Sequence, residues 1–240
     1  MKKVKTKDAV PVVAALEPRR KPAQDRAKQT VDQVLQAAAF EIEQGGLDKL
    51  TTKRIAAAAG LSVGGLYEYF PNKEAVVYAL ANRWLTQIRE AIDEVHPRHG
   101  GQRDVFTYLN DQFLLVARLY EGSPGLGALI QMLSAMPSLS ALSTEHDELV
   151  SANVCSALLH YAPNADVARV DAAARCIGMF CHGVLCAALV HKTAPPELLF
   201  AHLRVCLIAM TAPLLVEQRV VLFIYFWAKS PSRSKRQGFC

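Results

Sequence analysis

The sequence predicts an all-α protein, and three features of its patterning support that prediction. Apolar residues recur every three or four positions through most of the 240-residue chain, as they do on the buried face of a helix. Glycine and proline gather at a few short breaks that divide the chain into helix-sized segments. Runs of β-branched and aromatic residues are rare before residues 220–227. With 51% apolar residues, the chain can bury a sizeable core.

The first predicted helix spans residues 25–44. Glycines at positions 45 and 46 end it, because glycine readily adopts the left-handed conformation of a helix C-terminus. Its apolar positions follow a 3.6-residue period, and they are Val31, Val34, Leu35, Ala38 and Ile42. This helix therefore presents one apolar face to the segment that follows.

Two short helices joined by a tight turn are predicted at residues 51–73, which read TTKRIAAAAGLSVGGLYEYFPNK. Thr51 or Thr52 can cap the first helix, because a threonine oxygen accepts a hydrogen bond from a first-turn N–H. Gly60 supplies the backbone freedom that the turn needs, and Ser62 can cap the second helix. The inner face of the first helix holds Ile55, Ala56 and Ala59. This arrangement is typical of a helix-turn-helix, whose second helix enters the major groove of DNA.

The second of these helices, predicted over residues 63–69, has a composition that suits contact with DNA. Gly64 and Gly65 each cost roughly 1 kcal/mol relative to alanine inside a helix, but they let the backbone approach another surface closely. Tyr67 and Tyr69 offer hydroxyl groups that can reach phosphates. The next helix N-terminus has a lysine beside it, which suits a phosphate, and its residues are Pro71, Asn72 and Lys73.

These residues closely resemble the tetracycline-repressor (TetR) family of bacterial transcription regulators. The resemblance covers about residues 26–80 and includes many positions in register: Thr51-Thr52, Ile55-Ala56, Ala59-Gly60-Leu61-Ser62, Gly64, Leu66-Tyr67, Tyr69-Phe70 and Asn72-Lys73-Glu74. The family's first helix is matched by Ala37, Ala38, Phe40 and Gly45. Beyond residue 80, only a compatible helical pattern is present.

We predict which residues of this head contact DNA. Contacts to phosphates are assigned to side chains with hydroxyl or amino groups: Thr52, Lys53, Tyr67, Tyr69 and Lys73. Contacts to base edges or to the DNA backbone are assigned to the start of the second helix: Ser62, Val63, Gly64 and Gly65. Because these residues offer few hydrogen-bonding groups, we expect recognition through close approach, methyl contacts and DNA shape.

A helical body is predicted after the head. A fourth helix, from Lys73 to about residue 95, joins the two parts, and further helices are predicted at 102–121, 126–136, 138–161, 165–192 and 196–216. The resemblance implies a pocket for a small apolar or amphipathic ligand within this body. Residues that permit such a pocket, although each also fits plain core packing, are Trp84, Phe106, Phe113, Met132 and Met136.

The predicted helix at residues 165–192 is apolar nearly all round in its second half, so several of its sides need cover. In the resembled family, the last two long helices form a four-helix interface with a second subunit. We therefore expect a homodimer that pairs residues 165–192 and 196–216. Such a dimer presents two heads to the half-sites of a palindromic DNA operator.

Both ends of the chain are basic, within a net charge of +5. Residues 1–26 hold eight basic and three acidic side chains, and residues 219–240 hold five basic and no acidic ones. Basic ends suit a polyanion such as DNA and equally suit solubilising tails. Residues 1–23 are predicted to be a flexible arm that enters a minor groove or has no role. The apolar, then basic, tail at 219–240 fits an added interface, a membrane-touching segment or an altered terminus.

Some residue types with chemical potential have plainer explanations. His96 and His99 fit a metal or anion site, but a solvated turn is the favoured interpretation. Cys176, Cys181 and Cys186 recur every five residues, which turns a helix by ~500°, so they cannot close a zinc site by themselves. His182 is interpreted as a packed or interface histidine. Residues 143–147 include the residue types of a catalytic triad, namely Ser143, Glu145, His146 and Asp147. Closeness in the sequence does not provide the geometry of a triad, so no catalytic site is predicted here.

No motif indicates an enzyme, a cofactor or a metal site. The six cysteines are scattered through apolar helical patterns, which indicates reduced thiols and a cytoplasmic location. No stretch contains the roughly 18 uncharged apolar residues that a membrane span needs.

The predicted organisation is an arm over residues 1–23, a helix-turn-helix head over 24–73, a ligand-binding and dimerisation body over 74–218, and a tail over 219–240. The predicted function is that of a DNA-binding transcription regulator. The resemblance implies that it is a repressor, released when a small molecule shifts its fourth helix. The alternative is a helical small-molecule-binding protein, or a co-regulator with a protein partner, that does not use its head.

Overall fold

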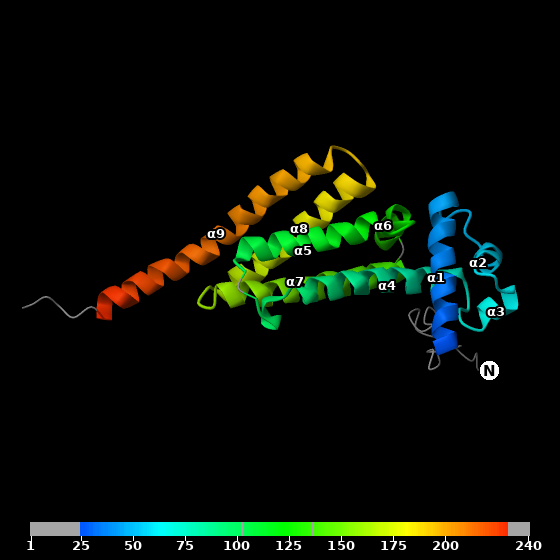
Figure 1. The fold of residues 1–240 in the computed structure, drawn as a ribbon, viewed down its shortest axis with the longest axis horizontal. Helices are drawn as coiled ribbons and strands as arrows, with labels where there is room; N and C mark the ends of the chain where they lie inside the picture. The colour runs from blue at the N-terminus through cyan, green and yellow to red at the C-terminus, as the bar shows by residue number, and fades with distance from the viewer. Residues whose placement is uncertain (1–24, 102, 136, 230–240) are drawn as a thin grey trace, which may run out of the picture.

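The protein is all-α in its computed structural model, which describes residues 25–101, 103–135 and 137–229. Only the backbone is described at residues 132, 134, 135, 137 and 138 and from residue 216 onward. Figure 1 shows an elongated molecule with a small head at one end and a body of longer helices. The head consists of α1 (Asp25–Gly45), α2 (Thr52–Ala58) and α3 (Val63–Tyr67). The predicted arm at residues 1–23 lies outside the described residues.

The helix α4 (Lys73–Glu94) joins the head to the body and packs against both. It contacts α1 in the head and α5 and α7 in the body, and it runs lengthwise under the body (Figure 1). Its buried side chains are Ala75, Val76, Val77, Ala81, Trp84, Leu85, Ile88 and Ile92. These residues belong to one apolar core that continues from the head into the body.

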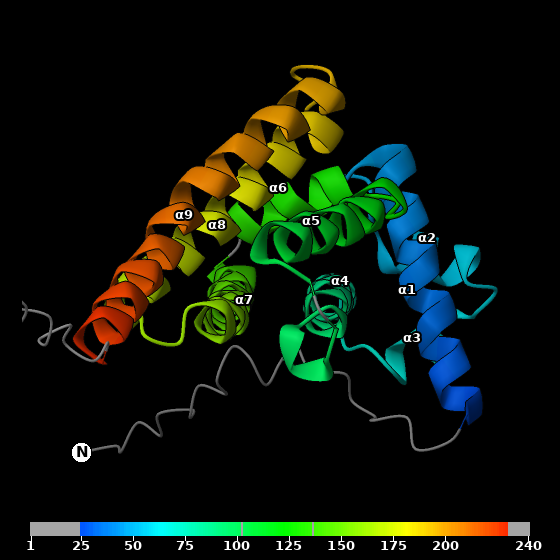
Figure 2. The ribbon, with the colours of Figure 1, turned by 60° about the vertical axis from the view of Figure 1, so that its left-hand side comes forward.

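The body consists of α5 (Val105–Glu121), α6 (Leu126–Ala135), α7 (Pro137–Tyr161), α8 (Val167–Leu185) and α9 (Pro196–Lys229). α7 packs against α4, α6 and α8, and α8 packs against α9. Figure 2 shows α8 and α9 as a pair on the side of the body away from α1. No strand occurs in residues 25–101, 103–135 and 137–229.

The head also touches the body directly, where the turn before α6 meets α1. Gly125 has φ +70 there, and its N–H donates a hydrogen bond to the Glu43 carboxylate. A Cβ atom at this glycine would lie 2.8 Å from the Ala39 carbonyl oxygen. Only glycine fits this position, because any side chain would collide with the backbone of α1.

Two predicted elements differ from the observed ones. α8 ends at Leu185 and is followed by a π-helical turn, η2 (Cys186–Val190), in place of one helix over residues 165–192. α9 continues as a helix through residues 220–227, where the sequence is β-prone, so the predicted boundary at 218/219 falls inside a helix. An existing helix gains one hydrogen bond for each residue added, whereas a lone strand has nothing to pair with.

Two helical stretches are long and apolar enough to cross a membrane by length and composition alone, Val167–Val190 and Pro196–Leu215. These stretches were not predicted from the sequence, because that prediction required an uninterrupted run of uncharged apolar residues. A criterion based on mean hydropathy also accepts stretches that contain single polar residues such as His182. Only 28% and 22% of the most apolar 18-residue windows in these stretches are buried within the chain. Such exposed apolar helices also fit an interface with another protein chain.

Candidate nucleic-acid interface and body cavity

The turn between α2 and α3 has the geometry that the sequence predicts. Gly60 has φ +68, a conformation that glycine adopts without steric cost. Its N–H donates to the carbonyl of Ala57 at 3.1 Å, and the next amide donates to the carbonyl of Ala56 at 2.8 Å. The residues that hold the two helices together are at most 1% exposed: Ile55, Ala56, Leu66 and Phe70. The inner face of α3 is thus fixed on the head, and its other face points outward.

Side chains cap three successive helices of the head. Thr51, Ser62 and Asn72 each accept a hydrogen bond from the backbone N–H three residues later, at 3.2, 2.9 and 2.7 Å. Each cap satisfies one of the N–H groups that a helix start leaves without a partner. The structure thereby selects Thr51 over Thr52 as the cap of α2.

The outward face of α3 is small and largely free of charge. Ser62, Val63, Gly64 and Tyr67 are exposed, whereas Gly65 is half-buried. A Cβ atom at Gly64 would come no closer than 3.8 Å to the Ser62 hydroxyl oxygen, which is ordinary contact. Packing within the head therefore does not require glycine at position 64.

Three of the predicted phosphate contacts have partners inside the head. The Thr52 and Tyr67 hydroxyl oxygens lie 3.3 Å apart, and the Lys73 ammonium donates to the Leu50 carbonyl at 3.3 Å. Tyr69 is half-buried and packs against the core. These side chains thus have a structural use that the sequence did not reveal. They therefore do not by themselves indicate phosphate contact.

Lys53 differs from those residues. Its side chain is exposed on α2 and makes no hydrogen bond or ion pair with the residues that the structure describes. A solvent-facing ammonium on α2 is available to a phosphate.

A cavity of about 510 Å³ lies in the body among α4, α5, α6, α7 and α8. Trp84 and Phe113 line it, as the pocket prediction requires. Phe106 does not line it and is 37% exposed. Phe106 shares a helix face with Phe113 but lies seven residues earlier, about 10 Å along the axis. The Met132 side chain and Met136 lie outside the described part of the chain.

Polar side chains enter this cavity from α5, α7 and α8, and no sequence pattern predicted that they would meet there. The Tyr120 hydroxyl is hydrogen-bonded to Nδ1 of His182 at 2.8 Å, and Nδ1 of His146 lies 3.3 Å from an Arg89 nitrogen. Asp147 also lines the cavity. These partners are 62 and 57 residues apart, so no local motif could have shown them.

Burial sets the protonation of these groups. Burial, with a further contribution from the Arg89 charge, lowers the pKa of His146 from 6.5 to about 4. Burial also lowers the pKa of His182, although Asp147 partly opposes the shift. Burial raises the pKa of Asp147, and His182 opposes that shift. Both histidines are therefore uncharged at neutral pH.

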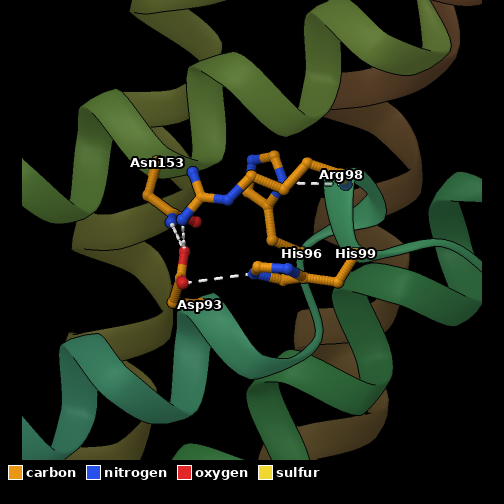
Figure 3. Close-up of polar contacts among 5 residues, drawn as sticks. All are labelled: Asp93, His96, Arg98, His99 and Asn153. Carbon is orange, nitrogen blue, oxygen red and sulfur yellow. Dashed lines mark hydrogen bonds and ion pairs between the residues drawn. The ribbon is translucent and has the colours of Figure 1, made fainter.

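A polar cluster ties the end of α4 to α7, and Figure 3 shows its five residues. The Asp93 carboxylate accepts hydrogen bonds from the guanidinium of Arg98, from Nε2 of His99 at 3.2 Å and from the amide of Asn153 at 3.0 Å. Nδ1 of His96 accepts the backbone N–H of Arg98 at 3.1 Å.

The prediction of a solvated turn here is wrong for His96, which is only 2% exposed. The short 3-10 helix η1 (Pro97–His99) folds this histidine beneath it, because Arg98 gives its ring a hydrogen-bonding partner. No group of three or more histidine, cysteine or acidic side chains suited to a metal ion occurs within residues 25–101, 103–135 and 137–229.

The cysteines of α8 and η2 point in different directions, as their spacing predicts. Cys176 is exposed, Cys181 is half-buried and Cys186 is buried. Burial raises the pKa of Cys181 to about 12, so its thiol stays protonated and unreactive.

The outer face of α8 and α9 is apolar and exposed. Its large side chains include Met179, which is 74% exposed, and Val205, which is 64% exposed. Others on the same two helices are Phe180, Leu198 and Ile208. Small exposed residues lie among them: Ala172, Cys176, Gly183, Ala201 and Ala209. A face of this composition allows another helix to pack closely against it.

Comparison with known proteins places the head in a family. Residues 34–80 match the family described as bacterial regulatory proteins, tetR family. An uncharacterised HTH-type transcriptional regulator of Bacillus subtilis, YvdT, is 34% identical over 91 residues, which is 36% of this chain and 45% of that protein. The aligned part of the chain thus spans less than half of that relative.

The fold of most of the chain is shared with solved structures. A tetR-family transcriptional regulator from Streptomyces coelicolor has a TM-score of 0.66 at 20% identity, over 86% of this chain and 91% of that chain. The multidrug binding protein EbrR, solved with imidazole, has a TM-score of 0.58 at 16% identity, over 75% and 94%. The head thus matches the TetR family over residues 34–80, and the helical body shares its fold with solved structures of TetR-family regulators.

Proposed function

We propose that the protein is a sequence-specific, DNA-binding transcription regulator. The observation that carries this proposal is the outward face of α3, where Ser62, Val63 and Gly64 are exposed and small. A helix with such a face can lie deep in the major groove, with its backbone close to base edges. The exposed Lys53 of α2 supplies charge for a phosphate. The relative named as an HTH-type transcriptional regulator supports the same function.

The proposed partner besides DNA is a second copy of this chain. The exposed apolar face of α8 and α9 is the surface that such a copy would cover, and both helices contribute large side chains to it. Gly183 and Ala201 leave room for close helix contact. A two-fold pair of heads then reads a palindromic operator.

We further propose that a small organic ligand in the body cavity releases the protein from DNA. α4 begins in the head at Lys73 and lines the cavity with Trp84, Leu85, Ile88 and Ile92. A ligand that favours one position of α4 would shift the population of head spacings. The similar protein EbrR is described as multidrug binding.

A second candidate function is ligand or partner-protein binding without use of DNA. The contacts of Tyr67 with Thr52 and of Lys73 with Leu50 favour it, because they give these residues a role within the head. A co-regulator of this kind would use the tail beyond residue 218, so removing that tail would abolish partner binding and leave the fold intact.

The test is DNA binding by the purified full chain, measured by fluorescence anisotropy. The operator is first selected from a random duplex pool and from the DNA flanking the gene, and affinity is then measured across a salt series. Lys53→Ala is expected to weaken binding by about three- to tenfold and to reduce the salt slope by about 1 per head. Arg103→Ala removes an exposed positive charge at the start of α5 and serves as the matched control.

Two results would contradict the proposal. One is a selection that enriches no sequence, with affinity equal for all duplexes. The other is an Arg103→Ala loss as large as that of Lys53→Ala, because a general effect of net charge would then explain binding. Either result favours the function without DNA.

A further inference from the structure

Two polar groups of the cavity lack partners, and they are chemically different. Trp84 is 4% exposed and lines the cavity, and its indole Nε1–H is buried without a hydrogen-bond acceptor. Asp147 lines the same cavity, and its carboxylate makes no hydrogen bond or ion pair with the residues that the structure describes. A buried donor without an acceptor is costly, and a bound molecule with an acceptor would remove that cost. Asp147 is exposed where it lines the cavity, so its carboxylate is open to an approaching cation.

The charges around the cavity decide which sign of ligand it accepts. Glu148 lines the wall near Asp147. Arg175 also lines the wall, but its guanidinium already donates to the Asp171 carboxylate at 2.8 Å. Arg89 contacts His146 and is not among the lining residues. The excess charge at the wall is negative, so an anionic ligand is disfavoured.

The two histidines of the wall do not reverse this sign. Burial lowers the pKa of His146 and of His182, so both rings are uncharged at neutral pH. His182 is in addition hydrogen-bonded to the Tyr120 hydroxyl at 2.8 Å. Neither ring therefore neutralises Asp147.

The remaining wall suits a flat organic cation. The Trp84 and Tyr120 rings meet edge to face with centroids 5.2 Å apart, and Phe113 lines the same space. Aromatic faces attract cations through their quadrupoles. A cavity of about 510 Å³ has room for a drug-sized molecule of three or four rings.

We propose that the cavity binds an aromatic organic cation that also has a hydrogen-bond acceptor. Asp147 pairs with its positive charge, and the indole N–H of Trp84 donates to its acceptor. The inference rests on the proposed function only in taking this cavity as the ligand site of the regulator.

The experiment compares two dyes that share a xanthene ring and a methyl ester and differ in charge. Rhodamine 123 is a cation, and the methyl ester of fluorescein is an anion at pH 8. Binding to the full chain is followed by dye anisotropy in the absence of DNA. Wild type is expected to bind rhodamine 123 about tenfold or more tightly than the fluorescein ester.

Variants of the cavity test each proposed contact. Asp147→Asn is expected to weaken rhodamine 123 about tenfold and to leave the fluorescein ester unchanged or tighter. Glu145→Gln makes the same charge change on an exposed residue of α7 that does not line the cavity, and it should leave both affinities within twofold. Trp84→Phe keeps an aromatic ring and removes the donor, so it should weaken rhodamine 123 but by less than Asp147→Asn.

Three results would overturn the proposal. Equal affinity for both dyes, or an Asp147→Asn variant that binds rhodamine 123 like wild type, would overturn the proposal. A loss as large in Glu145→Gln would also overturn it, because net charge would then account for the preference. Circular dichroism shows that each variant is folded. Because no DNA is present, these results are independent of the DNA-binding test.

Discussion

Gly64 of α3 has enough space around it for a larger side chain, as far as packing within the head is concerned. A Cβ atom there would lie 3.8 Å from the Ser62 hydroxyl oxygen and meet nothing closer. We therefore expect Gly64→Ala to raise the free energy of unfolding by about 0.5–1 kcal/mol, because alanine loses less backbone entropy in a helix. The same methyl group would push α3 off the DNA and weaken operator binding at least about tenfold. Urea denaturation and anisotropy measure the two effects separately.

Gly65 provides the contrasting variant. A Cβ atom at this position would lie 3.3 Å from the Ser62 hydroxyl oxygen, which accepts the Gly65 N–H as the cap of α3. Gly65→Ala should therefore lower both stability and DNA affinity. If Gly64→Ala bound the operator like wild type, close approach at this glycine would have no part in recognition.

At the scale of elements, the sequence predicts helices well where local signals are strong. The caps of α2, α3 and α4, the turn at Gly60 and the glycine end of α1 all follow from residues next to one another. Residues 220–227 have β-prone side chains but form the end of α9. The helix that precedes them, and not their own preference, decides their conformation, so the sequence pattern predicted the wrong structure here.

The polar groups of the body could not be predicted in this way. His182 meets Tyr120 from 62 residues away, and His96 is buried under a turn that Arg98 and Asp93 hold in place. Helix packing brings these residues into contact, and such long-range contacts cannot be predicted from the local patterns of a single sequence. Trp84 and Phe113 line the cavity as expected, because large aromatic residues on an inner helix face tend to meet in the core; their contact with a ligand stays a prediction.

The apolar face of α8 and α9 leads to a prediction about association. Val205→Glu puts a charge on this face, where 64% of the valine is exposed in the single chain. We expect the dimer dissociation constant to rise roughly a hundredfold or more, because a charge without a partner would be buried in the interface. Sedimentation equilibrium measures this change.

A matched variant distinguishes this face from general surface effects. Leu149→Glu introduces the same charge at an exposed apolar residue of α7, outside α8 and α9. It should leave the dimer intact. A Val205→Glu protein that sediments as the wild type does would show that copies pair elsewhere or do not pair.

For the whole molecule, buried neutral histidines make stability depend on pH. The pKa of His146 is lowered from 6.5 to about 4, chiefly by burial, so between these values the unfolded chain binds the additional proton. The free energy of unfolding should therefore fall on acidification by about 1.4 kcal/mol per pH unit from this group. The pKa of His96 is also lowered, mainly by burial, and adds to the loss. Urea denaturation at pH 7, 6 and 5 measures the slope.

The His146→Gln variant isolates one contribution to this slope. Glutamine can still accept a hydrogen bond from Arg89 but does not titrate, so its stability should vary less between pH 6.5 and 5. Asp147 opposes the trend, because burial raises its pKa and acid therefore favours the folded state. An unchanged slope in His146→Gln would assign the acid sensitivity to other groups.

The contact of Gly125 with α1 limits how this protein can be rebuilt. With a Cβ excluded by the Ala39 carbonyl and an amide held by Glu43, the turn before α6 is shaped to this one first helix. A chimaera that joins this head to the body of a related protein at a point within α4 would therefore lose this contact. A hybrid chain would need the residues on both sides of this contact, or its head and its body would lose their direct connection.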